Sequence, residues 1–250
     1  MDIRNRLYIS GFSERAAELA KEYNVGIEIN HTCISDSLDD RAKLVSDIRK
    51  DLDGIDKLIM HGPFTEIHPA SIDSRIRDAG MLRLKEAVEV LKELGLSRMV
   101  VHTGWLPFIY FKEYQAEKAA QFFERLMDSE NFTLAVENVL EDEPYMIKDM
   151  MEKINNPNIG ICLDVGHANC MDKERDIYTW IDVLSPYIVH IHLHNNDRLN
   201  DRHWSFDKGT MDISAVIAYI EKNCRPDITY TIESHDAESS LIYLKKEGFI

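Results

Sequence analysis

The chain has 250 residues, and its 44 Asp and Glu outnumber its 29 Lys and Arg, which gives a net charge of −15. Proteins that coat nucleic acid neutralise phosphates with basic residues, so this balance disfavours such a role while allowing a local basic patch. Hydrophobic residues make up 44% of the chain, an ordinary share for a soluble globular protein with a full core, and no run approaches the ~18 apolar residues of a membrane helix.

Eight short runs along the chain, rich in Val, Ile and Leu, predict strands. They are apolar nearly throughout, which is typical of strands buried on both faces. In chain order, the expected strands are Leu7–Ser10, Val25–Asn30, Lys57–His61, Arg98–His102, Phe132–Glu137, Ile159–Asp164, Ile188–His194 and Ile228–Glu233.

Around these runs, apolar residues recur at three- and four-residue spacing, which is the pattern of amphipathic helices. Asp212 and Asp236 stand at N-cap positions before the last two of these helices. In chain order, the expected helices are Ser13–Tyr23, Leu38–Leu52, Met81–Leu94, Tyr114–Met127, Tyr145–Ile154, Ile177–Leu184, Ile213–Ile220 and Ser239–Lys246.

The alternation of strands and helices, without a linker or a low-complexity segment, predicts an α/β fold. We expect a single-domain (β/α)8 TIM barrel over residues 1–250. A doubly wound open sheet is the alternative, but no Gly-rich phosphate loop follows the first strand. In a barrel, all the parallel strands end on one face, and barrel enzymes place their active sites there.

All ten histidines fall in or just after predicted strands, and none falls in a predicted helix. A lone strand-end histidine is more often structural or solvated than functional. Here, however, six successive strands end in a residue type that binds divalent metals. Carboxylates gathered on one rim would repel unless they were protonated or paired with cations, so we expect a metal site. The six residues, from the third strand to the eighth, are His61, His102, Glu137, Asp164, His192 and Glu233.

Several motifs at these strand ends resemble those of one superfamily, and they cover most of the chain in the family's order. On these motifs the chain resembles the xylose isomerase-like TIM barrels, also called AP endonuclease family 2. The resemblance implies the same (β/α)8 fold. The motifs are HGPF at 61–64, VVHTG at 100–104, VEN at 136–138, GICLDVGHA at 160–168, HIHLHNND at 190–197, DRHWSFDKG at 201–209 and TIES at 231–234.

The resemblance also implies metal ligands at nine positions, each of which carries the expected residue type. A central divalent metal would be held by Glu137, Asp164, His192 and Glu233. The endonuclease IV branch of the family binds three zinc ions; its first would use His61, His102 and Glu137, and its third would use His167, Asp201, His203 and Glu233. His190 and His194 flank His192 at two-residue spacing and are expected to be neighbours, not ligands.

Two reactions fit such a site. In the family's sugar isomerases and epimerases, the two matching glutamates form the proton-transfer pair, so we expect Glu137, Glu233 and His167 to be catalytic. This class, acting on a sugar or sugar phosphate with one to three divalent ions (Zn, Mn, Mg or Co), is favoured by the family match and the acidic chain. The alternative is an endonuclease IV-like phosphodiester hydrolase with a trinuclear zinc site, which would make nucleic acid the partner.

A third function class is a metal-stabilised binding or regulatory protein that has lost catalysis, and the intact pair of glutamates argues against it. Candidate substrate-binding residues are Asn138, Trp105, Arg198 and Arg202. Trp105 belongs to an aromatic loop at 104–114 that would form either a lid or a packing contact. The two arginines would meet a substrate phosphate or else be solvated charges. Glu28 and Asn30, at the end of the second strand, would contact ligands or substrate.

The N-terminal segment and the cysteines bear on location. Residues 1–18 lack the long apolar core of a signal peptide. Cys33, Cys162, Cys170 and Cys224 show no C-x-x-C spacing, so reduced thiols are expected. We therefore expect a cytoplasmic protein without a membrane partner. The sequence leaves a homo-oligomer open and does not name the sugar.

Overall fold

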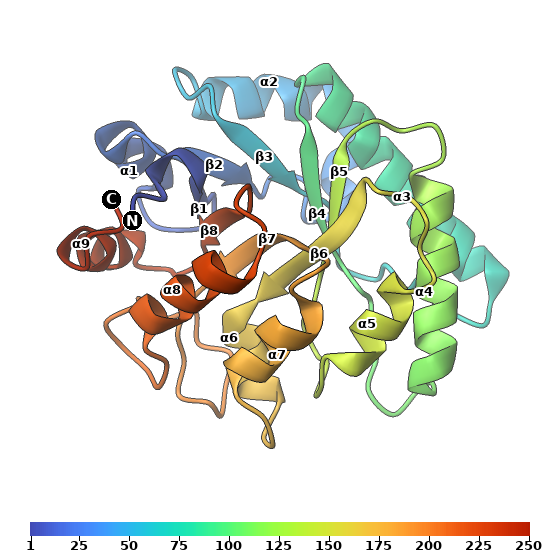
Figure 1. Cartoon of the computed structure of the whole chain (residues 1–250). Helices are drawn as coiled ribbons and strands as arrows, with labels where there is room; N and C mark the ends of the chain where they lie inside the picture. The colour runs from blue at the N-terminus through green and yellow to red at the C-terminus, as the bar shows by residue number, and fades with distance from the viewer.

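The computed structural model describes residues 1–250 and shows eight parallel strands closed into a barrel, in which β8 pairs with β1 (Figure 1). The predicted (β/α)8 barrel is confirmed. Each strand begins and ends within one residue of its predicted bounds. The strands are β1 (Leu7–Ser10), β2 (Gly26–Ile29), β3 (Leu58–His61), β4 (Arg98–His102), β5 (Thr133–Glu137), β6 (Ile159–Asp164), β7 (Ile188–Leu193) and β8 (Thr229–Ile232).

Helices surround the barrel on the outside (Figure 1). The α-helices are α1 (Ala16–Tyr23), α2 (Arg41–Asp51), α3 (Ser74–Glu93), α4 (Lys112–Leu126), α5 (Tyr145–Met151), α6 (Val165–Met171), α7 (Ile177–Leu184), α8 (Ile213–Asn223) and α9 (Ala237–Lys246). Two 3-10 helices are η1 (Arg4–Arg6) and η2 (Ser35–Asp40).

Local caps explain where several helices begin. Asp212 and Asp236 cap α8 and α9 as predicted, each accepting a hydrogen bond from a backbone N–H three residues later. The helix α3 begins well before the predicted Met81, because the side chain of Asp73 accepts a hydrogen bond from Arg75 N and caps an additional pair of turns. Arg15 has a positive φ of 55°, so α1 begins after it and not at Ser13.

The helix α6 was not predicted from the sequence, and it carries His167. No histidine falls in a predicted helix, so the helical position of His167 is a difference from the predicted elements. Asp164, the last residue of β6, caps this helix by accepting a hydrogen bond from His167 N at 2.6 Å. A helix of 7 residues is too short to show the helical periodicity on which such predictions depend.

The apolar core lies mainly between the strands and the helices, where 64 buried residues form one cluster. Inside the barrel, Val100, Ala135 and Cys162 form a second, small cluster. Barrel interiors are ordinarily filled by layers of branched aliphatic side chains. Here Glu28 and His190, both fully buried, also occupy the interior. The barrel interior is therefore partly polar beneath the strand ends.

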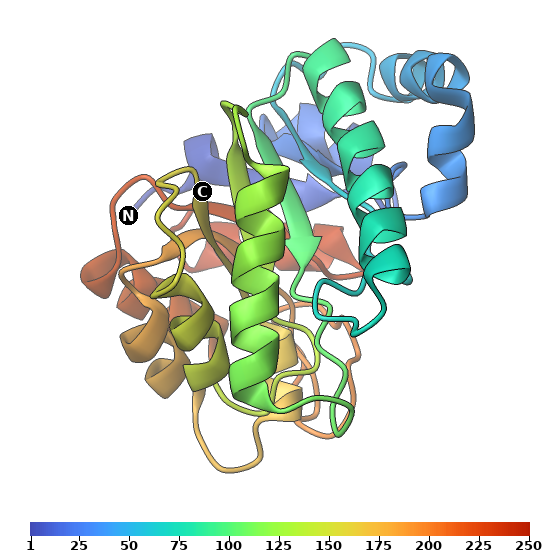
Figure 2. The same ribbon diagram turned by 90° about the vertical axis from the view of Figure 1, so that its right-hand side faces the viewer.

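The two ends of the chain meet beside the barrel, where Ile3 N donates a hydrogen bond to Phe249 O at 2.9 Å (Figure 1). On the outer wall, α3 and α4 lie side by side (Figure 2). None of the helices combines the length and the apolar character that crossing a bilayer requires.

Candidate metal centre

The ends of the parallel strands bring the candidate ligands to one face of the barrel, here called the mouth. His102 pairs with Glu137 across β4 and β5, and Asp164 pairs with His192 across β6 and β7. A cavity of about 510 Å³ opens at the mouth. Seven of the nine predicted ligands line it, namely His61, His102, Glu137, His167, Asp201, His203 and Glu233.

Four residues, here called the central group, are Glu137, Asp164, His192 and Glu233, and each offers one ligand atom within 4.8 Å of the others. His192 Nδ1 lies 3.3 Å from Glu137 Oε1 and 3.5 Å from Glu233 Oε2. All four residues are buried, and neither His192 Nδ1 nor Asp164 Oδ2 has a hydrogen-bond partner. Buried carboxylates without a cation are strongly unfavourable, so these residues fit a divalent metal ion.

Glu28 supports the central group from inside the barrel. Its Oε2 lies 3.1 Å from His192 Nε2 and 3.3 Å from His190 Nε2, and it accepts a hydrogen bond from Thr231 Oγ1 at 2.5 Å. Burial raises the pKa of Glu28, but His192 and His190 lower it by more. The pKa therefore lies well below its usual range, and the carboxylate is ionised. An Nε2–H donated to Glu28 leaves the Nδ1 lone pair of His192 facing the other ligands.

His61, His102 and Glu137 form a second set, here called the rim group, whose ligand atoms also lie within 4.8 Å of one another. His61 Nε2 is 3.2 Å, and His102 Nε2 is 3.5 Å, from Glu137 Oε2. Burial lowers the pKa of His102 to about 3, so its ring is neutral, which is the form that binds metals. Phe64 stacks on this ring at 4.4 Å and fixes its plane.

A third set, here called the corner group, consists of His167, His194, Asp201 and His203. Asp201 Oδ2 lies 3.3 Å from His167 Nε2 and 3.2 Å from His203 Nε2. His194, which the sequence pattern favours as a neighbour and not a ligand, also belongs to this set, and its Nε2 lies 3.7 Å from Asp201 Oδ1. The two-residue spacing from His192 places both rings on the same face of the chain and is the signal that points to His194.

The two glutamates of the central group hold protons differently. Burial raises the pKa of Glu137, but His192 and His102 lower it by more, so that the pKa lies well below its usual range. Burial raises the pKa of Glu233 to about 7, with His192 opposing and Glu137 adding to the rise. Without a cation, one carboxylate is thus ionised while the pKa of the other lies near neutral pH; a bound cation would lower the pKa of Glu233 and favour its ionised form.

None of the four predicted substrate-binding residues lines the cavity. Asn138 brackets Asp164: its Nδ2 donates to Asp164 O at 3.0 Å, and its Oδ1 accepts from Asp164 N at 2.8 Å. Trp105 is buried. Arg198 donates to the carbonyl of Arg175 at 3.0 Å, and Arg202 pairs with Asp197 at 3.3 Å.

Apolar residues from the first three loops line the cavity instead. Phe12 follows β1, Ile34 follows β2 and Phe64 follows β3. Asn30, one of the two residues noted at the end of the second strand, also lines the cavity. Phe64 stands in the HGPF motif at 61–64, whereas Phe12 and Ile34 lie in no motif, and loop positions carry no periodic signal that would distinguish them from ordinary surface residues.

Two known proteins show moderate sequence similarity to the chain. An uncharacterized protein of Methanocaldococcus jannaschii, MJ1311, is 25% identical over 178 residues, which cover 66% of this chain and 60% of that protein. A probable endonuclease 4 of Ureaplasma parvum is 25% identical over 190 residues, which cover 66% of this chain and 61% of that protein. The chain thus spans less than two thirds of the length of these relatives.

Solved structures share the fold. A D-tagatose 3-epimerase-like protein superposes with a TM-score of 0.78 at 21% identity, covering 97% of this chain and 96% of that one. The TTHB071 protein from Thermus thermophilus, soaked with ZnCl2, gives 0.77 at 24% identity, covering 98% and 97%. A D-allulose 3-epimerase from Methylomonas sp. in complex with D-allulose gives 0.72 at 14% identity, covering 99% of each chain. At these identities the likeness establishes the fold alone.

The family model described as xylose isomerase-like TIM barrel matches residues 14–247. This range includes seven of the eight strands and every candidate ligand from His61 to Glu233. The match therefore extends over nearly the whole barrel. The chain belongs to the xylose isomerase-like TIM barrel family.

Proposed function

We propose that the protein is a divalent-metal-dependent sugar isomerase or epimerase that moves a proton at the carbon beside a carbonyl. One observation carries the proposal. Two buried glutamates, Glu137 and Glu233, border the same cavity from β5 and β8, with His192 Nδ1 3.3 Å and 3.5 Å from their oxygens. The shared fold with a D-tagatose 3-epimerase-like protein and a D-allulose 3-epimerase supports this class.

The central group would hold the metal, which would polarise the substrate's carbonyl and adjacent hydroxyl and acidify the C–H between them. Glu137, ionised, then removes a proton from one side of the bound sugar. Glu233, which borders the cavity from β8, returns a proton from the other side. His167 stays a candidate for contacting a substrate hydroxyl, since it lines the cavity beside Glu137.

A neutral sugar fits the cavity better than a sugar phosphate. None of the 13 residues that line it is Lys or Arg. Phosphate recognition ordinarily uses such cations, often in bidentate geometry. Phe12, Ile34 and Phe64 instead offer apolar surfaces against which the less polar face of a sugar ring can pack. We therefore expect an unphosphorylated monosaccharide or a derivative of one.

Solvent deuterium exchange tests the proposal. The metal-loaded protein is incubated in deuterated water with a panel of neutral sugars that includes D-allulose and D-tagatose, and a matched panel of their phosphates. Deuterium should enter at the carbon beside the carbonyl of at least one neutral sugar. If the whole panel shows neither exchange nor conversion, the proposal is wrong; if only phosphates exchange, the argument from the cavity lining is wrong.

A phosphodiester hydrolase is the second candidate, and one observation favours it. The central, rim and corner groups line or adjoin one cavity, and clustered metals can activate water and clamp a phosphoryl group. The net charge of −15 and the absence of Lys and Arg from the cavity lining argue against nucleic acid. Cleavage of DNA containing an abasic site, without deuterium exchange into any sugar, would favour the hydrolase.

A further inference from the structure

We propose that Arg98, at the end of the barrel opposite the mouth, is a positioning residue for the central group. Through two residues in the barrel interior, Thr229 and His190, it sets the direction of the hydrogen bonds that reach Glu28. Glu28 in turn contacts His192, a candidate metal ligand, at 3.1 Å. The proposal rests on the proposed function only in that the central group binds a metal ion, and it does not depend on the sugar.

Arg98, Thr229, His190 and Glu28, here called the polar column, lie along the inside of the barrel. Arg98 and Thr229 are the first residues of β4 and β8, whereas the mouth lies where the strands end. Arg98 shares a strand face with Val100, which belongs to the small cluster inside the barrel. Glu28 and His190 are the third residues of β2 and β7 and are fully buried. Polar side chains thus replace part of the aliphatic layers that ordinarily fill such a barrel.

Neighbouring members of the polar column are in contact. Arg98 Nη1 donates a hydrogen bond to Thr229 Oγ1, while Arg98 Nε is buried without a partner. Thr229 Oγ1 lies 2.6 Å from His190 Nδ1. His190 Nε2 lies 3.3 Å from Glu28 Oε2 and 3.0 Å from Thr231 Oγ1. The contacts therefore continue from the far end of the barrel to the carboxylate that supports the central group.

The chemistry of the donors sets the direction of these bonds. A guanidinium group can only donate, so Thr229 Oγ1 accepts from Arg98. The hydroxyl hydrogen of Thr229 then has His190 Nδ1 as its acceptor. A neutral ring that accepts at Nδ1 carries its proton on Nε2, and His190 donates this proton towards Glu28. The hydrogen bonds therefore run from Arg98 to the carboxylate.

The same residues allow a reversed arrangement, which Arg98 disfavours. With its proton on Nδ1, His190 would donate to Thr229 and accept from Thr231 at Nε2. Glu28 would then lose two donors, since Thr231 Oγ1 donates to it at 2.5 Å in the structure. Thr229 would lie between two donors, and its own hydrogen would have no acceptor, because its Oγ1 makes no other hydrogen bond. An unmade bond at a buried site is costly, so Arg98 selects the first arrangement.

The donors that reach Glu28 fix the position of its carboxylate opposite His192. Its Oε2 receives the bonds from His190, Thr231 and His192, whereas its Oε1 is buried without a partner. These bonds alone therefore hold the carboxylate against rotation. In the reversed arrangement only the bond from His192 would remain, and the ring of that ligand would lose a fixed partner. Outer partners of this kind orient the histidines that bind metals.

The polar column also separates the central group from a further set of ligand atoms inside the barrel. Cys162, His190 and His192 offer one such atom each, all within 4.8 Å of one another. Both nitrogens of His190 already have hydrogen-bond partners, so this ring needs no ion to satisfy it. His192 Nδ1, which faces the central group, has no such partner. His190 is therefore assigned to positioning and not to metal binding.

Nitrogen-15 NMR of the histidine rings tests the proposal, because it shows which ring nitrogen carries the proton. In the metal-free full chain, His190 and His192 should both carry it on Nε2. Arg98→Met removes the guanidinium, so part of the population should carry the His190 proton on Nδ1. Zinc titration followed at His192 Nδ1 should show an affinity about 2–10-fold lower, the range for one hydrogen bond. Arg98→Lys, which keeps a charged donor, should restore both readouts.

A double-mutant cycle tests whether Thr229 transmits the effect. Thr229→Val removes the hydroxyl, and in that background Arg98→Met should lower the zinc affinity no further. If Arg98→Met does not fold, Arg98→Gln replaces it, because a neutral amide can accept as well as donate and so permits the reversed arrangement.

Three results would overturn the proposal. They are a proton on Nδ1 of His190 or His192 in the metal-free wild type, unchanged proton positions and zinc affinity in the folded Arg98 variant, and an equal loss of affinity with and without the Thr229 hydroxyl. The proposed function fails separately. If zinc does not shift His192 Nδ1, the central group does not bind the ion, whereas the proton positions, measured without metal, still test the polar column.

Discussion

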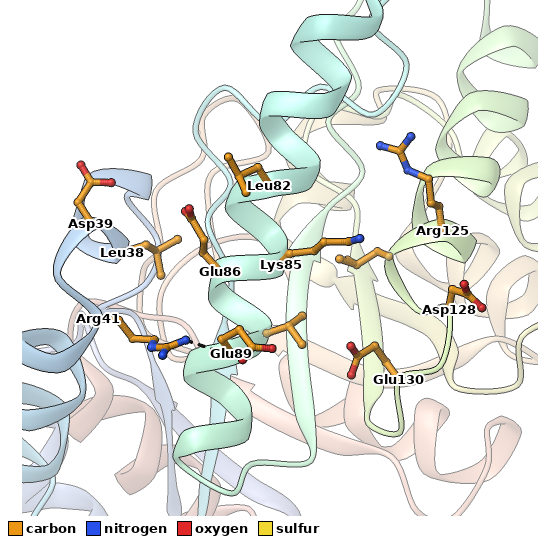
Figure 3. A pocket seen from close by; sticks show the side chains of 12 residues that line it. Leu38, Asp39, Arg41, Leu82, Lys85, Glu86, Glu89, Arg125, Asp128 and Glu130 are labelled. Atoms are coloured by element: carbon orange, nitrogen blue, oxygen red, sulfur yellow. Dashed lines mark ion pairs between the residues drawn. The ribbon is translucent and has the colours of Figure 1, made fainter.

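Two cavities of the molecule are lined by charged side chains, which are exposed to water in one and buried in the other. A groove of about 700 Å³ on the outer wall, here called the outer groove, runs between η2, α2, α3 and α4 (Figure 3). Its charges are exposed: Arg41 and Glu89 pair at 3.8 Å with about half of each side chain in water. At the mouth, the side chains of Glu137, Asp164 and His192 are at most 1% exposed.

Burial, more than volume, separates the two cavities. Exposed charges are solvated by water and need no ligand, so their pairing contributes little. Buried carboxylates lose that solvation and require a cation or a proton. The cavity at the mouth therefore requires a bound cation or proton, whereas the outer groove does not.

The largest effect should come from Glu233→Gln, assayed at saturating metal. Gln keeps an oxygen for the metal but cannot exchange a proton, so turnover should fall by about 10²–10⁴-fold. Metal content is measured on the same sample, because a variant that had simply lost its ion would not test proton transfer. Turnover close to the wild-type value with metal bound would remove Glu233 from the proposed pair.

The second-largest effect should be a loss of thermal stability when the metal is removed. An ion that binds only the folded state, present at about 100 times its Kd, stabilises it by about 2.7 kcal/mol. For a chain of this size that corresponds to roughly 5–10 °C in Tm. Calorimetry with and without a chelator measures the shift. Equal Tm values would mean that the buried carboxylates do not need a cation, and the contrast with the outer groove would fail.

The sequence predicts more of the fold than of the candidate site. The apolar strands predict the barrel because strands buried on both faces carry a strong, local signal; β1, β4 and β6 have the predicted bounds. The strand ends predict which face carries the ligands, since parallel strands all end together. The helix α6 could not be predicted, because a helix of 7 residues is too short to show helical periodicity.

Side-chain contacts across the barrel are what the sequence cannot supply. Glu28 and His192 are separated by 164 positions, and their contact exists only once the barrel closes. Arg198 shows the reverse case. It stands near the ligand motifs in the sequence but donates to a carbonyl away from the cavity. The roles of the nine expected ligands stay predictions until metal binding is measured.

Glu28→Gln should have an intermediate effect and extends the comparison into the barrel interior. A glutamine side chain can offer its NH₂ to His192 Nε2, which would favour the proton on Nδ1 and block the metal-facing lone pair. Loss of such a supporting carboxylate typically weakens metal binding by about 10–100-fold. Competition with a zinc indicator measures the affinity. Thr231→Val, which removes another partner of Glu28 but leaves its contact with His192, is the matched control.

The smallest effect should come from the outer groove. Arg41→Ala deletes a half-exposed guanidinium that reaches Glu89 at 3.8 Å and Glu93 at 3.5 Å. Because water replaces such contacts, Tm should change by no more than about 1–2 °C, with zinc content and turnover unchanged. A change in turnover as large as that of Glu28→Gln would show that exposed charges on α2 and α3 act on the mouth. Burial would then no longer distinguish the functional cavity from the solvated one.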